Sequence, residues 1–242
     1  MGNRHVERMD LAQVNQGTMS VHLARYHFAA PFCAGKKILD VACGGGYGTS
    51  LLSKTAIEAC GVDIDEETVA YAIKHFESAN ARFQAGDATQ LPFGDSCFDT
   101  VVSFETIEHM DDAARYLKEM RRVLRTDGVY IVSTPKSVRT NPKPANPFHR
   151  VEYSLADFRS LLERYFVRVE LYGQSTTGKS AAHRWLARLD CLRLRRLLPT
   201  DVKSRATKVV GSTPFEEMGL DDQKITKNEF AAARTMIAVC RG

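Results

Sequence analysis

A glycine-rich run and three spaced acidic residues carry the clearest chemical signal in this chain of 242 residues. Residues 40–48 read Asp-Val-Ala-Cys-Gly-Gly-Gly-Tyr-Gly after an apolar stretch, which predicts a loop between a strand and a helix. Glycines let a ligand approach the backbone. Asp63 ends the next apolar run, where a carboxylate accepts hydrogen bonds from two ribose hydroxyls, and Asp87 follows a third run, where it is placed to accept from an adenine amino group. The dinucleotide fingerprint G-x-G-x-x-G fits imperfectly, because Thr49 stands at its third glycine.

A second group of polar residues, Glu105-Thr-Ile-Glu108-His109, follows another apolar run. If a helix begins here, Glu105, Glu108 and His109 fall on one face at spacings of three and four. A helix N-terminus disfavours imidazolium, so His109 would be neutral and available as a ligand or a base. Two carboxylates and an imidazole suit Mg²⁺, Mn²⁺ or Zn²⁺.

Strand and helix patterns alternate around these residues. Such alternation predicts a doubly wound α/β fold, with a mainly parallel sheet between helices. The expected strands are 37–42, 59–63, 81–84, 98–104 and 129–133, and the expected helices are 18–30 (ending before Pro31), 49–54, 66–78 and 111–124 (closed by Asp127-Gly128).

The second half departs from this alternation. Four prolines between residues 134 and 150 forbid a regular element and predict a long loop. Ser154 begins a helix to about Tyr165. Strands are expected at 166–172 and 234–240, the last one antiparallel, with an α-helical insertion between them. We therefore predict one domain, 1–242, with a helical cap (1–30), a cofactor core (36–133), a proline-rich active-site loop (134–153) and a basic lid (175–230).

The charge is distributed unevenly. The formal net charge is +4, but residues 175–210 hold nine basic and two acidic residues, which leaves the rest at −3. The ordinary apolar fraction of 44% excludes disordered and fibrous classes. Arg184, Arg188 and Arg195 share a helical stripe, which indicates either a solvated face of a lid helix or a surface that steers an anionic substrate.

The cysteine pattern and the apolar segments of the sequence bear on the cellular compartment. Its six cysteines are scattered without disulfide or zinc spacing, and the N-terminus has no apolar signal-peptide core. No apolar stretch approaches the roughly 20 residues that span a bilayer. We expect a cytoplasmic protein with no membrane span.

The run from Ile38 to Ser133 resembles a class I S-adenosylmethionine-dependent methyltransferase of the type 11-like group, with a Rossmann-like fold. Five segments match its motifs in order: Ile-Leu-Asp-Val-Ala-Cys-Gly-Gly-Gly-Tyr-Gly, Gly-Val-Asp-Ile-Asp, Gly-Asp-Ala-Thr-Gln-Leu-Pro-Phe, Phe-Asp-Thr-Val-Val-Ser and Arg-Val-Leu-Arg-Thr-Asp-Gly. The resemblance implies S-adenosylmethionine as cofactor. It implies that Asp40 and the backbone of Ala42, Gly44 and Gly46 hold the amino-acid end, Asp63 the ribose, Ile64, Asp87 and Ala88 the adenine, and that Ser103 and Phe104 lie under the methionine portion.

The Glu105–His109 run also resembles the E-x-x-E-H metal motif of metal-dependent O-methyltransferases. One such group acts in ubiquinone synthesis, and the other methylates the 3′-terminal 2′-hydroxyl of small RNAs. The RNA group has a further histidine, and His149 matches its position. The resemblance implies a divalent metal held by Glu105, Glu108, His109 and His149. The alternatives are a Glu-His pair that braces the loop without metal, and His149 as a general base or substrate contact.

These observations favour transfer of a methyl group to oxygen, with nitrogen as the alternative acceptor atom. Glu105, His109 and His149 are the candidate catalytic residues. We expect a small hydroxylated acceptor, such as a sugar, glycan or natural product. Ribose 2′-O-methylation of RNA is an alternative, although the chain has no recognisable RNA-binding module. A dinucleotide- or adenosyl-binding protein without methyl transfer is another. A second copy of the chain, in a homodimer, is a further possible partner.

Overall fold

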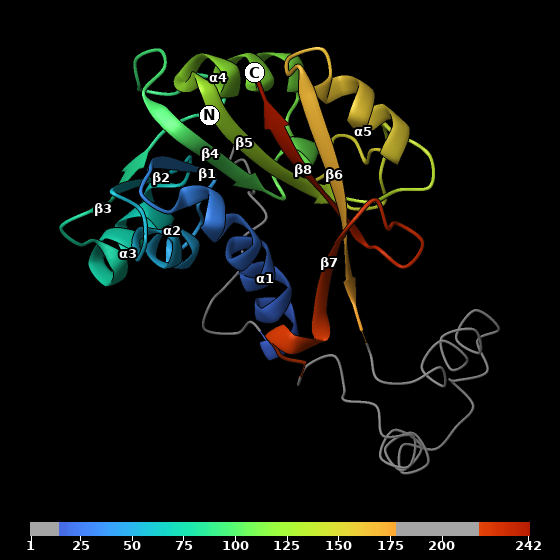
Figure 1. The fold of residues 1–242 in the computed structure, drawn as a ribbon, viewed down its shortest axis with the longest axis horizontal. Coiled ribbons are helices and arrows are strands. Elements are labelled where there is room, and N and C mark those ends of the chain that lie inside the picture. Colours follow the sequence, from blue (N-terminus) through green and yellow to red (C-terminus); the bar gives the residue numbers. More distant parts are fainter. Residues whose placement is uncertain (1–14, 178–217) are drawn as a thin grey trace, which may run out of the picture.

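The computed structural model describes residues 15–177 and 218–242, which form an eight-stranded sheet with helices on both faces (Figure 1). The strand order is β3-β2-β1-β4-β5-β8-β6-β7. The strands are β1 (Lys37–Val41), β2 (Glu58–Asp63), β3 (Ala81–Ala85), β4 (Phe98–Phe104), β5 (Leu124–Pro135), β6 (Arg168–Thr176), β7 (Gln223–Lys227) and β8 (Thr235–Arg241), and the helices are α1 (Gln16–Cys33), α2 (Tyr47–Ser53), α3 (Glu66–Phe76), α4 (Ala113–Val123) and α5 (Leu155–Leu162).

The first five strands pair in parallel. The chain builds β1, β2 and β3 in one direction and then crosses to place β4 on the other side of β1. The strand order therefore reverses between β1 and β4, so the loops after these two strands lead to opposite sides. Open α/β sheets bind ligands in the crevice between such loops. The fold therefore places the glycine-rich loop after β1 beside the segment that follows β4.

Side-chain alternation along the strands divides the core between the two faces of the sheet. Leu39 and Val101 pack with α4 and α5, whereas their neighbours Ile38 and Val102 pack with α1 and α2. All four side chains are fully buried. The central strands are thus apolar on both faces, as expected for a parallel sheet covered by helices.

The predicted α/β fold is confirmed, with differences at the ends of several elements. Helix α1 does not stop before Pro31 but includes it in its last turn. Helix α4 runs from Ala113 to Val123, close to the predicted 111–124, but Asp127-Gly128 does not close it, because β5 begins at Leu124, which is extended and pairs with Phe98 of β4. The predicted loop 134–150 forms only isolated bridges, although β5 extends into it as far as Pro135.

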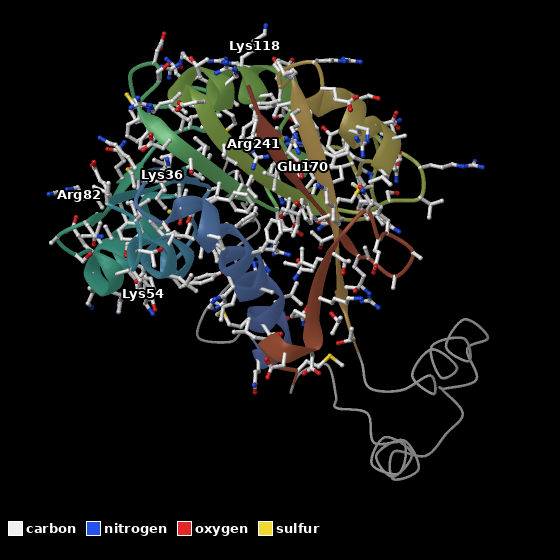
Figure 2. The ribbon with its side chains drawn as sticks, viewed as in Figure 1. Lys36, Lys54, Arg82, Lys118, Glu170 and Arg241 are labelled. Atoms are coloured by element: carbon white, nitrogen blue, oxygen red, sulfur yellow. The ribbon has the colours of Figure 1, made fainter. Side chains whose placement is uncertain are left out.

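The C-terminal edge of the sheet contains one strand that the sequence patterns did not predict. β8 is antiparallel to both β5 and β6, as expected for the last strand, and β7 adds an antiparallel edge to β6. Glu170 of β6 lies beside Arg241 of β8 (Figure 2), with Oε1 and Nη1 3.2 Å apart. The basic stripe and most of the predicted helical insertion lie outside the described residues.

Within the described ranges, no helix combines the length and the apolar character needed to cross a membrane. The described cysteines are all free thiols.

We expect Gly48→Ala to lower the free energy of unfolding by about 2–3 kcal/mol, because overpacking a tight core costs this much. A Cβ at Gly48 in α2 would lie 1.9 Å from the ring of Tyr26 in α1. Gly94→Ala is the matched control, since its Cβ would meet only Cys97 Sγ at 3.5 Å. Urea denaturation of both variants checks this; equal stability of the two proteins would contradict it.

Candidate functional site

A cleft of about 850 Å³ opens at the carboxyl ends of the parallel strands. Its lining comes from the loops that follow β1, β2, β3 and β4, from the segment 147–150 and from one face of α1. The cleft therefore lies at the reversal of strand order, where the fold predicts a ligand site.

Most of the predicted cofactor residues line this cleft. The loop after β1 turns sharply, with Ala42 and Gly44 both at positive φ (58° and 53°). That geometry presents backbone atoms to the cleft rather than side chains. The predicted residues that line it are Ala42, Gly44, Asp63, Ile64, Asp87, Ala88 and Phe104.

The two acidic residues predicted to bind the cofactor, Asp63 and Asp87, are held by backbone and side-chain donors. Gly44 N donates to Asp63 Oδ2 over 2.9 Å, and Asp65 N donates to Oδ1 over 3.0 Å. Asp63 therefore ties the glycine-rich loop to the turn after β2 while it faces the cleft. Asp87 Oδ1 accepts from both the amide and the hydroxyl of Thr89, at 2.7 and 2.8 Å. Each carboxylate keeps lone pairs for a ligand, because an ionised carboxylate has about four acceptor positions.

Asp40, Gly46 and Ser103 do not line the cleft, contrary to the contacts that the resemblance implies. Asp40 is fully buried behind the loop, where its carboxyl accepts from Thr49 Oγ1 (2.7 Å) and from the Tyr26 hydroxyl (3.4 Å). Burial, which outweighs these hydrogen bonds, raises the pKa of Asp40 to about 7. Ser103 Oγ donates to the Val41 carbonyl over 3.0 Å. These residues shape the loop from behind rather than contact a ligand in the cleft.

Gly46 has its own steric reason to lie behind the loop. It adopts φ +85°, and a Cβ there would meet Ala72 at 2.7 Å and Phe83 at 2.9 Å. Helix α3 therefore packs against the loop only because this position has no side chain.

Three of the four predicted metal ligands come together in the lining of the cleft. Glu108, His109 and His149 each offer a ligand atom, and these atoms all lie within 4.8 Å of one another. His109 Nδ1 lies 3.0 Å from the Phe148 carbonyl, and His149 Nδ1 lies 3.1 Å from Glu152 Oε1. Both partners only accept hydrogen bonds, so we assign the proton to Nδ1 in each ring, which makes Nε2 the basic nitrogen.

Glu108 is the buried member of this cluster. Its Oε2 accepts from Thr134 Oγ1 over 2.9 Å, and its Oε1 has no hydrogen-bond partner among the described residues. Burial, reinforced by the nearby Glu105 charge, raises the pKa of Glu108 well above its usual range. A buried carboxyl oxygen without a partner is an open position for a cation or a donor.

Glu105, the fourth predicted ligand, lies outside this cluster. The predicted helix does not begin at Glu105; a short 3₁₀ turn runs from Ile107 to His109, and Glu105 adopts a left-handed φ of 52°. Its carboxylate accepts from Ser133 Oγ over 2.7 Å instead. The prediction of one helical face for all three residues was therefore wrong, because the backbone reverses before the turn begins.

Helix α1, most of which lies in the predicted helical cap of residues 1–30, forms one wall of the cleft, but the sequence patterns did not identify which of its side chains line it. Thr18, His22 and Tyr26 line it, at spacings of four that put them on one helical face. Burial, and secondly the charge of Arg25, lower the pKa of His22 to about 3, so its imidazole is neutral at physiological pH. The four-residue spacing was available in the sequence, but the side of α1 that faces the cleft depends on long-range packing.

The cleft joins a glycine-rich loop, Asp63 and Asp87 at the reversal of a doubly wound sheet, which is where such folds bind ligands. The Methyltransferase domain family matches residues 39–132. A "probable S-adenosylmethionine-dependent methyltransferase" of Mycolicibacterium smegmatis is 35% identical over 204 residues, which cover 83% of this chain and 75% of that protein. The chain belongs to the S-adenosylmethionine-dependent methyltransferases.

Two further relatives agree with this assignment, and a solved structure shares the fold. A phthiotriol/phenolphthiotriol dimycocerosates methyltransferase of Mycobacterium ulcerans is 32% identical over 139 residues, 56% of this chain and 49% of that protein. A methyltransferase of Mycobacterium tuberculosis named in the same words as the first relative is 38% identical over 158 residues, 63% of this chain and 56% of that protein. A methyltransferase structure from Thermotoga maritima shares the fold, with a TM-score of 0.63 at 15% identity over 93% of this chain and 90% of that one.

Proposed function

We propose that the protein transfers the methyl group of S-adenosylmethionine to a hydroxyl oxygen of a small acceptor, with His149 as the general base. The observation that carries the proposal is the Glu152–His149 pair at the cleft. A carboxylate that accepts from Nδ1 orients the ring and leaves Nε2 as the nitrogen that can accept a proton. A hydroxyl needs such help far more than an amine, since a neutral amine is already a nucleophile.

The reaction is an in-line displacement. The acceptor oxygen attacks the methyl carbon, the bond from carbon to sulfur breaks, and S-adenosylhomocysteine leaves with the electron pair. The acceptor proton passes to His149 Nε2. Catalysis of this kind depends largely on positioning, and general base catalysis adds about 10²- to 10⁴-fold.

The cluster of Glu108, His109 and His149 also fits a divalent metal, and metal assistance is the alternative form of the proposal. With an ion bound, His149 Nε2 would be a ligand, and the ion rather than His149 would activate the acceptor hydroxyl. Both histidines donate Nδ1–H to an oxygen acceptor, as metal-bound histidines usually do. Glu108 supplies the buried oxygen without a described partner. A divalent ion bound here would lower the pKa of an acceptor hydroxyl.

We expect His149→Gln to lower kcat by at least about 100-fold, because the variant keeps the size of the side chain but loses the base. The assay offers deuterated-methyl S-adenosylmethionine with a panel of methyl glycosides, catechols and aliphatic diols. Aliphatic diols are included because the Mycobacterium ulcerans relative is named for phthiotriol lipids. Mass spectrometry then identifies the atom that carries the label. Chelated enzyme with and without added Mg²⁺, Mn²⁺ or Zn²⁺ tests the metal.

His75→Gln is the matched control, because His75 lies on α3 and does not line the cleft. Label on nitrogen, or a His149→Gln variant as active as the control, would contradict the proposal. Equal activity and no bound ion after chelation would remove its metal part alone.

Methylation of an RNA ribose is the second candidate, and the same three-residue cluster is what favours it. A short single-stranded RNA with a free 3′ end therefore forms one arm of the panel, and its labelling in preference to the small acceptors would select it.

A further inference from the structure

We propose that Glu105 binds a cationic group at the amino-acid end of S-adenosylmethionine, and that Arg25 positions its carboxylate for this role. Glu105 would then determine cofactor specificity rather than ligate a metal. The inference needs only the cofactor, so it stands apart from the identity of the methyl acceptor.

The register of the sheet places Glu105 next to the glycine-rich loop. β1 and β4 pair in parallel, with Asp40 opposite Val102. Ser103 Oγ then donates to the Val41 carbonyl, where the loop begins. Glu105 follows two residues later and lines the cleft, with 24% of its side chain exposed. Its carboxylate is therefore the first charged group that β4 presents to the cleft.

Several bonds fix Glu105 in an unfavourable backbone conformation. Its N–H donates to both the carbonyl and the hydroxyl of Ser133, at 3.2 and 3.1 Å. Its carboxylate accepts from the same hydroxyl over 2.7 Å. A glutamate at φ 52° is strained, and such residues persist where the surroundings hold them, often at functional sites.

Arg25 reaches Glu105 from α1, on the other wall of the cleft. Its Nη1 lies 3.9 Å from Glu105 Oε1 and donates to Gln174 Oε1 over 3.2 Å. Gln174 in turn donates to the Val21 carbonyl over 2.8 Å, which ties β6 to α1. Arg25 is only 1% exposed, and its Nε and Nη2 have no hydrogen-bond partner among the described residues. A buried cation with so few partners indicates a charge arrangement that a ligand completes.

The cofactor matches this arrangement. Its amino-acid end carries an ammonium, a sulfonium and a carboxylate, so a fixed anion beside the glycine-rich loop complements its excess positive charge. Either cation, the ammonium or the sulfonium, would attract the Glu105 carboxylate, but only the ammonium is still charged after the reaction. Methyl transfer removes the sulfonium charge but leaves the ammonium.

Calorimetric titration with three ligands tests the proposal. S-adenosylmethionine carries both cations, S-adenosylhomocysteine only the ammonium, and 5′-methylthioadenosine neither. We expect Glu105→Gln to raise the Kd of S-adenosylmethionine by 10- to 100-fold and to leave that of 5′-methylthioadenosine within about twofold, since a charged hydrogen bond is lost. A matching loss for S-adenosylhomocysteine assigns the ammonium, and an unchanged value assigns the sulfonium.

Arg25→Lys and Ser133→Ala test the positioning role. We expect Ser133→Ala to show part of the Glu105→Gln pattern, and Arg25→Lys to retain more affinity than Arg25→Met. Glu119→Gln is the control, because Glu119 also pairs with an arginine, Arg122, but does not line the cleft. Equal changes for all three ligands, or no change for any, would overturn the proposal. Both outcomes are independent of acceptor methylation and of His149.

Discussion

Asp63→Ala is expected to raise the Kd of S-adenosylmethionine and S-adenosylhomocysteine by about 100-fold, because we propose that Asp63 accepts two charge-assisted hydrogen bonds from the ribose hydroxyls. The structure adds a second reason. Asp63 Oδ2 accepts from Gly44 N, so the substitution also releases the loop that faces the amino-acid end of the cofactor. Isothermal titration calorimetry measures both affinities.

Asp87→Ala and Asp127→Ala are measured beside Asp63→Ala, so that its loss of affinity is compared with that of a second cleft residue and of an exposed control. Asp87 lines the cleft, but Thr89 already engages its Oδ1 with two bonds, so we expect a smaller loss of about 5- to 10-fold. Asp127 is 90% exposed and lies outside the cleft. Loss of affinity in Asp127→Ala, or an Asp63→Ala variant that binds like the unchanged protein, would remove Asp63 from the ribose site.

The cofactor half of the site could be predicted from sequence because its residues lie in short segments directly after the strands. A strand of known direction places its last residues at the carboxyl edge of the sheet. This reasoning located Asp63 and Asp87 correctly in the cleft. The roles of Asp40 and Ser103 came from the resemblance instead, and neither residue lines the cleft, because both lie within strands, where alternate side chains point into the two cores rather than toward the edge.

The acceptor half depends on contacts between distant segments. Glu108 and His149 are separated by α4, β5 and most of a proline-rich loop whose path no local pattern specifies, and the resemblance rather than the spacing brought them together. Glu105 was misplaced because its left-handed backbone cannot be inferred from a glutamate, which rarely adopts it. The face that α1 presents, with His22, and the edge strand β7 are set by packing against the finished sheet.

Asp40→Asn is expected to change how stability depends on pH. Burial raises the pKa of this carboxyl from 3.8 to about 7, so the folded chain holds the proton more tightly than the unfolded chain. Ionisation of the unfolded chain therefore reduces stability as pH rises from about 4 to about 7, and the penalty is constant above that. The resulting loss in the free energy of unfolding is on the order of 4 kcal/mol. Asparagine cannot ionise, so the variant escapes the penalty.

The measurement is the free energy of unfolding by urea between pH 4 and pH 8. Relative to the unchanged protein, Asp40→Asn should be least stable at pH 4 and gain stability up to pH 7. Asp112→Asn, at the exposed N-cap of α4, is the control, because asparagine caps a helix as well as aspartate does. Parallel curves for Asp40→Asn and the unchanged protein would show that burial does not govern this carboxyl. A folded Asp40→Asn variant should also keep its affinity for S-adenosylhomocysteine, because Asp40 supports the loop from behind and does not reach the cleft.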